Sequence, residues 1–328
     1  MRTLAVYGWS DSTPALLEAL RTRAELEAVA IGDERPAALA RARTATGLAV
    51  FQHAREMARS ARFDTLLLGA GEHAAEIAEV AAARGADLVA IGALASADVL
   101  SRASIAAHRF GVALTVLRPW LRDPALLEVG ARLSFEPPAL LLIDAAEPRP
   151  PMRLLRDLVA VATRVVGAPA IEVSASTLED DESAPLTAHV RYASGRTVML
   201  SARMALAPAL RVLASSPERT LEARTISGCT VLEETPARSG VLPFAPVDRR
   251  AAVHREAARA VVAAEAESDA GFAPAEAALL GAIEHALAGS FAEPVQLAPR
   301  PFQLLRGGRS VTGPRAAGAG PALSVVGG

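Results

Sequence analysis

LAVYGWSDSTP, residues 4–14, decides the fold predicted for this chain. A short apolar run ends at Gly8, mostly polar residues follow, and a helix pattern opens at Pro14 and continues to about Thr22. Strand, tight turn and helix in this order are typical of the start of a dinucleotide-binding domain, where a pyrophosphate binds at the helix N-terminus. We therefore expect an N-terminal Rossmann domain, with Thr13 as N-cap and proline at the first helical position.

The glycine pattern of this turn is incomplete. Their usual spacing is G-x-G-x-x-G, whereas residues 8–13 read GWSDST, so only the first glycine is present. Ser10 places a Cβ where a backbone should approach phosphate closely, and Asp11 places a negative charge beside the pyrophosphate. The sequence predicts weakened binding of NAD or NADP, and the candidate cofactor-binding residues of the turn are Gly8, Ser10, Ser12 and Thr13.

A second strand is expected over residues 26–33, with Asp33 at its C-terminal end. In dinucleotide-binding folds an acid about 20 residues after the glycines binds the adenosine ribose, which makes Asp33 a candidate cofactor ligand. Arg35 is placed to meet a 2′-phosphate instead. Asp33 also fits as the cap of a helix from Pro36 to Gly47, and both interpretations stay open at this level.

Strand and helix patterns continue to alternate as far as residue 120. Strands are expected at 49–51, 63–71, 87–92 and 112–117, and helices at 54–62, 72–84 and 97–110. Continuously apolar strands separated by helices of this length indicate a doubly wound parallel sheet. We assign residues 1–122 to this domain.

The second half of the chain has a different pattern. A proline-rich linker at 147–151 leads into one helix at 152–166, and strand patterns with alternating apolar residues follow up to residue 233. Two helices, at 249–267 and 274–288, come last. We therefore expect an α+β domain at 123–298 with a large, mostly antiparallel open sheet. The Gly-, Pro- and Ala-rich tail at 299–328 is expected to be flexible.

Composition excludes several classes of protein. A net charge of −2 gives no reason to expect nucleic acid or a membrane surface as a partner, and no apolar run reaches the length of a membrane span. Cys229 is the only cysteine, and the histidines lack metal-ligand spacing, so we expect no disulfide and no metal. The N-terminus lacks a signal-peptide pattern, so the expected location is cytoplasmic.

All 34 basic residues of the chain are arginine. A guanidinium does not give up its proton near neutral pH. Any reaction step that needs a lysine amine or a Schiff base is therefore excluded for this chain.

Seven landmarks in order resemble the glucose–fructose oxidoreductase / inositol dehydrogenase (Gfo/Idh/MocA) family, over residues 1–298. They begin with the strand-turn at Gly8 and the acid at Asp33. The others are 63–64 leading to Gly71-Glu72-His73, 85–89, 165–169 with 172–175, 226–228, and 283–286 with 294–295. The match at 71–73 makes Gly71 a further cofactor-binding candidate.

The resemblance implies a Rossmann domain, an α+β domain whose open sheet serves in oligomer contacts, and NAD(P)-dependent hydride transfer at the carbon of a sugar or related alcohol. Typical members carry a lysine in a Glu-Lys-Pro motif, and an Asp and a His on the first helix of the second domain. Here residues 91–93 read Ile-Gly-Ala, with glycine at the lysine position. The helix offers Asp157, and no histidine occurs from residue 152 to 167.

The weak catalytic candidates each have an alternative interpretation. Asp157 is placed to form an acid–base couple with Arg153 or Arg156, or to belong to a solvated set on a helix face. His73 is placed near the nicotinamide side of a cofactor, or caps a helix. Arg118 lies at the domain crossing, near Trp120 and Arg122. These residues either bind a ligand or pack between the two domains. Cys229 is expected to be buried rather than nucleophilic.

Two functions from different classes follow from these observations. The first is a pseudoenzyme that has lost dehydrogenase catalysis and acts as a binding, partner or regulatory subunit, as a homo-oligomer or with an active homologue. The second is a divergent NAD(P)-dependent oxidoreductase that uses other groups on a sugar-like or other small alcohol or carbonyl substrate. An enzyme unrelated to redox chemistry that reuses the cleft is a third, weaker hypothesis.

Overall fold

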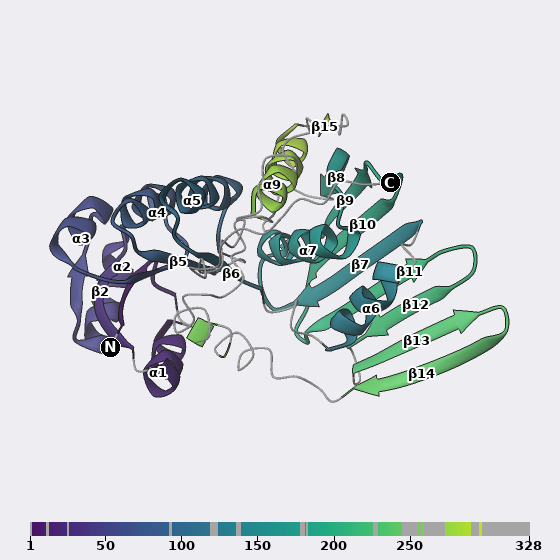
Figure 1. Cartoon of the computed structure of the whole chain (residues 1–328), viewed down its shortest axis with the longest axis horizontal. Helices are drawn as coiled ribbons and strands as arrows, with labels where there is room; N and C mark the ends of the chain where they lie inside the picture. Colours follow the sequence, from purple (N-terminus) through teal and green to yellow (C-terminus); the bar gives the residue numbers. More distant parts are fainter. Residues whose placement is uncertain are drawn as a thin grey trace, which may run out of the picture.

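The computed structural model contains two sheets, one of six and one of nine strands, which follow each other along the chain (Figure 1). The structure describes residues 2–10, 13–24, 26–91, 94–118, 124–135, 139–177, 181, 183–225, 229–244, 255, 257–258, 273–289 and 295–296.

The six-stranded sheet is a doubly wound parallel sheet, as the sequence predicted. Its strands run in the order β3-β2-β1-β4-β5-β6, and all five neighbouring pairs are parallel. The strands are β1 (Thr3–Tyr7), β2 (Glu27–Gly32), β3 (Ala49–Phe51), β4 (Thr65–Leu68), β5 (Asp87–Ile91) and β6 (Leu114–Leu117). The helices are α1 (Thr13–Ala24), α2 (Pro36–Thr46), α3 (Ala54–Ser60), α4 (Ala74–Ala83) and α5 (Ala97–Phe110).

Helices cover both faces of this sheet. Alternate residues of β1 enter two different cores: Leu4 and Val6 pack with residues of α1 and α2, whereas Ala5 and Tyr7 pack with residues of α3, α4 and α5. Figure 1 shows α3, α4 and α5 on one side of the sheet and α1 on the other. Burial on both faces explains why these strands are continuously apolar.

The nine-stranded sheet is mostly antiparallel, with one parallel pair between β7 and β10. Its order is β14-β13-β12-β11-β7-β10-β9-β8-β15. The strands are β7 (Leu140–Glu147), β8 (Ala170–Thr177), β9 (Leu186–Tyr192), β10 (Thr197–Met204), β11 (Ala209–Ser215), β12 (Thr220–Arg224), β13 (Cys229–Thr235), β14 (Arg238–Phe244) and β15 (Val295–Gln296). Three helices accompany it, α6 (Pro124–Phe135), α7 (Pro151–Val166) and α9 (Ala273–Ala288).

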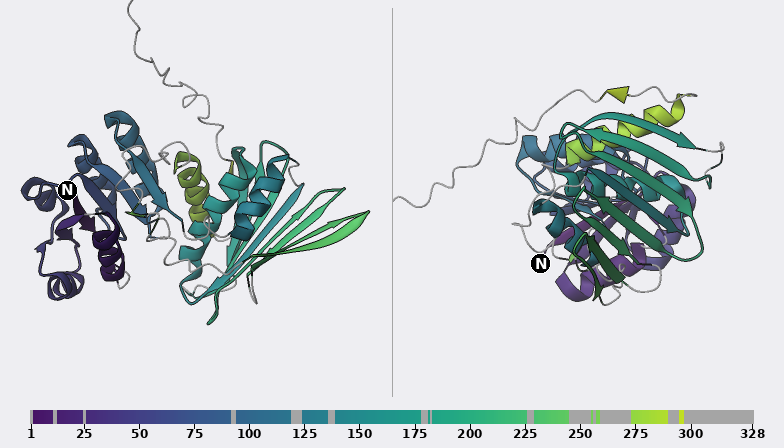
Figure 2. Two further views of the ribbon diagram at one scale, coloured as in Figure 1. Left: turned by 60° about the horizontal axis from the view of Figure 1, so that its bottom comes forward. Right: turned by 90° about the vertical axis from the view of Figure 1, so that its right-hand side faces the viewer.

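These three helices pack on one face of the nine-stranded sheet. Their apolar residues form one core with the inward-facing residues of the strands, such as Val198, Leu200 and Ala202 of β10. The opposite face appears in the right view of Figure 2, and no helix of the described residues covers it. The sheet is therefore open on one side, as predicted.

Helix α6 and strand β14 are absent from the sequence prediction. Helix α6 places Ala125, Val129 and Leu133 four residues apart on one buried face, which is a signal that the sequence already contained. Strand β14 contains glycine and Pro243, both unfavourable in strands, and it is tolerated at the edge of the sheet, where a missing N–H leaves no ladder bond unmade. The predicted helix at 249–267 and the tail lie largely outside the described residues.

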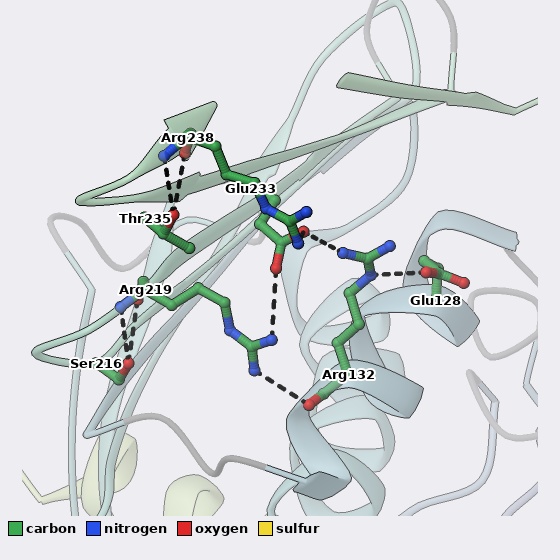
Figure 3. Close-up of polar contacts among 7 residues, drawn as sticks. All are labelled: Glu128, Arg132, Ser216, Arg219, Glu233, Thr235 and Arg238. Carbon is green, nitrogen blue, oxygen red and sulfur yellow. Dashed lines mark hydrogen bonds and ion pairs between the residues drawn. The ribbon is translucent and has the colours of Figure 1, made fainter. Parts of the chain in front are cut away.

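A network of arginines around Glu233 fastens α6 to the sheet (Figure 3). Arg132 of α6 pairs with Glu233 of β13, and its Nε donates to Glu128 at 2.6 Å. Arg219 lies with its Nη1 3.5 Å from Glu233 and donates from Nη2 to the backbone carbonyl of Arg132. The partly buried carboxylate of Glu233 thereby joins β13 to α6 and to the turn before β12.

Helix α9 connects the two domains. Its Ala273 and Ala277 belong to the core between the Rossmann sheet and α3–α5, whereas Leu280 and Ile283 belong to the core of the nine-stranded sheet. It packs against both α5 and β8 and lies between them in Figure 1. No helix within the described ranges is long and apolar enough to span a bilayer.

We predict that Leu158→Ala lowers the free energy of unfolding by about 2–5 kcal/mol, because Leu158 has no exposed surface and its removal leaves a cavity. Urea denaturation measures the change. Leu206→Ala, at a side chain that is 98% exposed, is the matched control and should shift stability by less than about 0.5 kcal/mol. Equal effects of the two substitutions would contradict the packing of α7.

Candidate functional site

The turn between β1 and α1 is closed by the chain itself. Gly8 has a φ of 88°, and a Cβ at this position would lie 2.3 Å from the carbonyl oxygen of Ala70. The N–H of Gly69 donates to the carbonyl of Tyr7 at 2.7 Å. Gly8 is therefore required by the close approach of the loop after β4, whatever the turn binds.

The amide N–H groups of this turn have partners within the chain. Gly8 donates to the Gly32 carbonyl at 2.9 Å, and Trp9 donates to Asp33 Oδ2 at 2.7 Å. Ser10 donates to Thr13 Oγ1 at 3.0 Å, and Thr13 donates back to the Ser10 carbonyl at 3.0 Å. In a phosphate-binding turn these groups point at the ligand, whereas all four that the structure describes are satisfied internally.

Two cofactor candidates of this turn need further comment. Thr13 was expected to be the N-cap, but it is the first residue of α1, and its hydroxyl accepts a hydrogen bond from the N–H of Ser10 in the preceding turn. Ser12 lies outside the described residues.

Asp33 is completely buried and its carboxylate is fully engaged. Oδ1 accepts hydrogen bonds from the backbone N–H and Nε of Arg35, each at 2.8 Å. Oδ2 accepts from Arg35 Nη2 and from Trp9 N–H, each at 2.7 Å. Arg35 Nη2 also donates to the Trp9 carbonyl at 2.8 Å. The two predicted cofactor contacts thus bind each other and the turn, and the structure gives α2 Arg35 as its N-cap residue, not Asp33.

The protonation of Asp33 reflects this arrangement. Burial by itself would raise the pKa of Asp33, but the hydrogen bonds from Arg35 and Trp9 outweigh burial and hold the pKa below its usual value. The same ion pair raises the pKa of Arg35. Both groups are therefore charged at neutral pH.

Glu34 ties three strand ends together, and sequence reasoning missed it. Its Oε2 accepts from Tyr7 Oη at 2.9 Å, at the end of β1, and its Oε1 accepts from the N–H of Glu72 after β4. Burial and the neighbouring Glu34 raise the pKa of Tyr7 well above its usual value. A Cβ on Gly71 would lie 2.9 Å from the Tyr7 ring, so Gly71 makes room for this bridge. The order of strands in the sheet, unseen in the sequence, creates the contact.

His73 lies outside this cluster. Its ring is half exposed, and its Nδ1 is 3.7 Å from Glu76 Oε2, one turn into α4. It occupies the N-cap position of α4 without a side-chain cap hydrogen bond. The structure therefore gives His73 no contact with Asp33, Glu34 or Asp157 among the interactions of the described residues.

Asp157 is buried at the crossing between the domains. Its Oδ2 accepts from Arg149 Nη2 at 2.8 Å, and its Oδ1 lies 3.9 Å from Nη1 of Arg118, which follows β6. The partners considered from sequence lie elsewhere: Arg153 is exposed, and Arg156 donates to Glu284 of α9 at 3.3 Å. Asp157 is thus a buried ion-pair member and does not belong to a solvated helix face.

Other predicted positions lie outside the described residues. These are the glycine at the lysine position, Trp120, Arg122 and the side chain of Cys229. Within the described part of the chain, no group of three or more His, Cys, Asp and Glu side chains could hold a metal ion.

Known structures share this two-domain arrangement. UDP-N-acetylglucosamine 3-dehydrogenase GnnA from Acidithiobacillus ferrooxidans superimposes with a TM-score of 0.69 at 16% identity, covering 87% of this chain and 97% of that one. An oxidoreductase from Agrobacterium radiobacter in complex with NAD+, L-tartaric acid and magnesium gives a TM-score of 0.73 at 15% identity, covering 90% and 98%.

A variant of KijD10, a 3-ketoreductase from Actinomadura kijaniata in complex with TDP-benzene and NADP, gives a TM-score of 0.69 at 18% identity, covering 87% and 98%. No protein-family model matches the sequence, and no curated protein gives a significant match. The chain therefore shares the two-domain fold of these oxidoreductases. In particular, the chain has the Gfo/Idh/MocA fold, as its sequence landmarks indicated.

We predict that Asp33→Asn lowers the free energy of unfolding at pH 7 by about 1.5–3 kcal/mol, the value of buried charge-assisted hydrogen bonds. Because the pKa of Asp33 is lowered by folding, its ionised form stabilises the protein above the unfolded pKa of about 3.9, and this contribution is lost as pH falls through the folded pKa. The difference between the two proteins should therefore shrink at pH 3.

Urea denaturation at both pH values tests this prediction. Glu18→Gln is the control, because Glu18 forms an exposed pair with Arg21 at 3.0 Å and should contribute less than about 0.5 kcal/mol. A difference of the same size at pH 7 and pH 3 would contradict the role given to the Asp33 carboxylate.

Proposed function

We propose that this chain is a non-catalytic relative of NAD(P)-dependent oxidoreductases that acts as a binding, partner or regulatory subunit. The observation that carries the proposal is the internal pairing of the β1–α1 turn. Its described N–H groups and the Asp33 carboxylate all have partners within the chain. A dinucleotide would have to displace these bonds before it gained its own.

The described residues at the domain crossing support the same proposal. A general acid or base must reach a substrate proton, but Asp157 is buried and paired with Arg149. The chain contains no lysine to replace that of typical members of the resembled family. Fold alone does not carry chemistry when the groups that perform it are absent or engaged.

We predict that a calorimetric titration with NADH or NADPH gives no binding with a Kd tighter than about 1 mM, because the phosphate and ribose contacts are already used. KijD10, whose variant was solved with NADP, serves as the positive control under the same conditions. Micromolar binding would overturn the proposal and favour the divergent oxidoreductase. The structural neighbours that contain NAD+ or NADP support this divergent-oxidoreductase alternative.

The open face of the nine-stranded sheet is the surface we propose for the partner. The strand register places Val241, Leu232, Leu213, Leu142 and Met199 on one cross-strand row, with Glu222 between Leu232 and Leu213. The row is therefore apolar apart from Glu222, whose charge is paired with two arginines, Arg211 and Arg224. Such a face suits a second copy of the chain or an active homologue. The single cysteine is compatible with the reducing cytoplasm as the place of this function.

We predict that the protein self-associates at micromolar concentration and that Leu142→Arg weakens association by about tenfold or more, because an unpaired buried charge costs over about 1.4 kcal/mol. Sedimentation velocity measures the change. Ile105→Arg, at a side chain on α5 that is 63% exposed, is the control and should leave association unchanged. A wild-type monomer, or equal effects of both variants, would contradict the proposed self-association.

A further inference from the structure

Arg118 reaches from the Rossmann domain into the second domain. It follows β6, its side chain is 2% exposed, and its Nη2 donates to Glu276 Oε2 in the first turn of α9. Its Nη1 lies 3.9 Å from Oδ1 of Asp157 on α7. One guanidinium therefore lies against carboxylates of two helices that pack on the other sheet.

Further ion pairs extend this contact into a partly buried cluster around the guanidinium of Arg118. Arg149 pairs with Glu147 and with Asp157, and Arg164 Nε lies 3.9 Å from Glu276 Oε1. Three arginines thus face three carboxylates, and the charges balance without a ligand. Buried ions are tolerated only while their partners remain in place.

The geometry of Arg118 makes the cluster sensitive to domain position. Its Nε and Nη1, and Oδ1 of Asp157, are buried with no hydrogen-bond partner among the described residues. The guanidinium therefore depends on the bond to Glu276. A shift of α9 relative to β6 would leave a desolvated cation without that bond, at a cost that a solvated surface pair would not incur.

We propose that Arg118 is an interdomain latch that holds the two domains of this protein in one relative orientation. The apolar packing of α9 keeps the domains together, with Gly281 approaching Ala97 of α5 at 3.6 Å for a built Cβ. Small apolar contacts are non-directional. The directional ion pairs of Arg118 fix the angle between the two domains, so that the domains do not open and close around a ligand. This inference is independent of whether a dinucleotide binds.

Electron paramagnetic resonance between two spin labels, one on each domain, tests the latch in the full chain. Labels are placed at Ala83→Cys, at the end of α4, and at Leu206→Cys, in the exposed turn after β10, in a Cys229→Ser background. With Arg118 present we expect one narrow distance distribution. Arg118→Met should at least double the width of that distribution and lower the melting temperature.

Two further variants distinguish an effect on the relative orientation of the domains from an effect on overall stability. Arg118→Met with Glu276→Gln removes both buried charges of the pair, so the melting temperature should recover while the distribution stays broad. Arg102→Met removes a partly exposed arginine of α5 that pairs with Glu79 at 2.7 Å, and should leave the distribution narrow. If Arg118→Met does not fold, the width of the distance distribution in the double variant tests the proposal. A narrow distribution in either folded Arg118 variant overturns the proposal.

Discussion

The rest of the Rossmann domain is arranged around one carboxylate, that of Asp33. It is buried at the end of β2 and holds the turn after β1 through Trp9, and the start of α2 through Arg35. A buried charge must be paired, so this contact cannot be given up without exposing or protonating the carboxylate. The turn, the second strand and the second helix therefore form one unit, held together by hydrogen bonds to Asp33.

At the crossing between the domains, buried carboxylates are again paired with arginines, and more charged groups take part. Asp157 and Glu276 are neutralised by Arg118 and Arg149, all from within the chain. In both places charged groups of the described residues pair with each other. Because these contacts involve separate elements, they support the proposed non-catalytic function independently. The chain shares its fold with known oxidoreductases, and fold alone does not carry chemistry.

The strands and most helices could be predicted from periodicity, because burial on one or both faces leaves a repeat in the sequence. Helix α5 begins and ends where the sequence predicted, from a serine N-cap to a glycine in the left-handed region. Strand β14 could not be predicted in this way, since its place at the edge removes the usual penalty for Pro243. The incomplete glycine pattern of the turn after β1 was also readable, because Ser10 stands where a glycine is expected.

The sequence by itself determined the parallel sheet, the open antiparallel sheet, the incomplete glycine turn and the absence of lysine chemistry. These are properties of residue type and local spacing. Only the tertiary structure decided that Asp33 binds Arg35 and Trp9, that Glu34 bridges β1 and the loop after β4, and that Arg118 meets Glu276 158 positions away. The physical reason is that a carboxylate pairs with whichever donor the strand order and helix packing bring within hydrogen-bond distance, and sequence spacing does not contain that order.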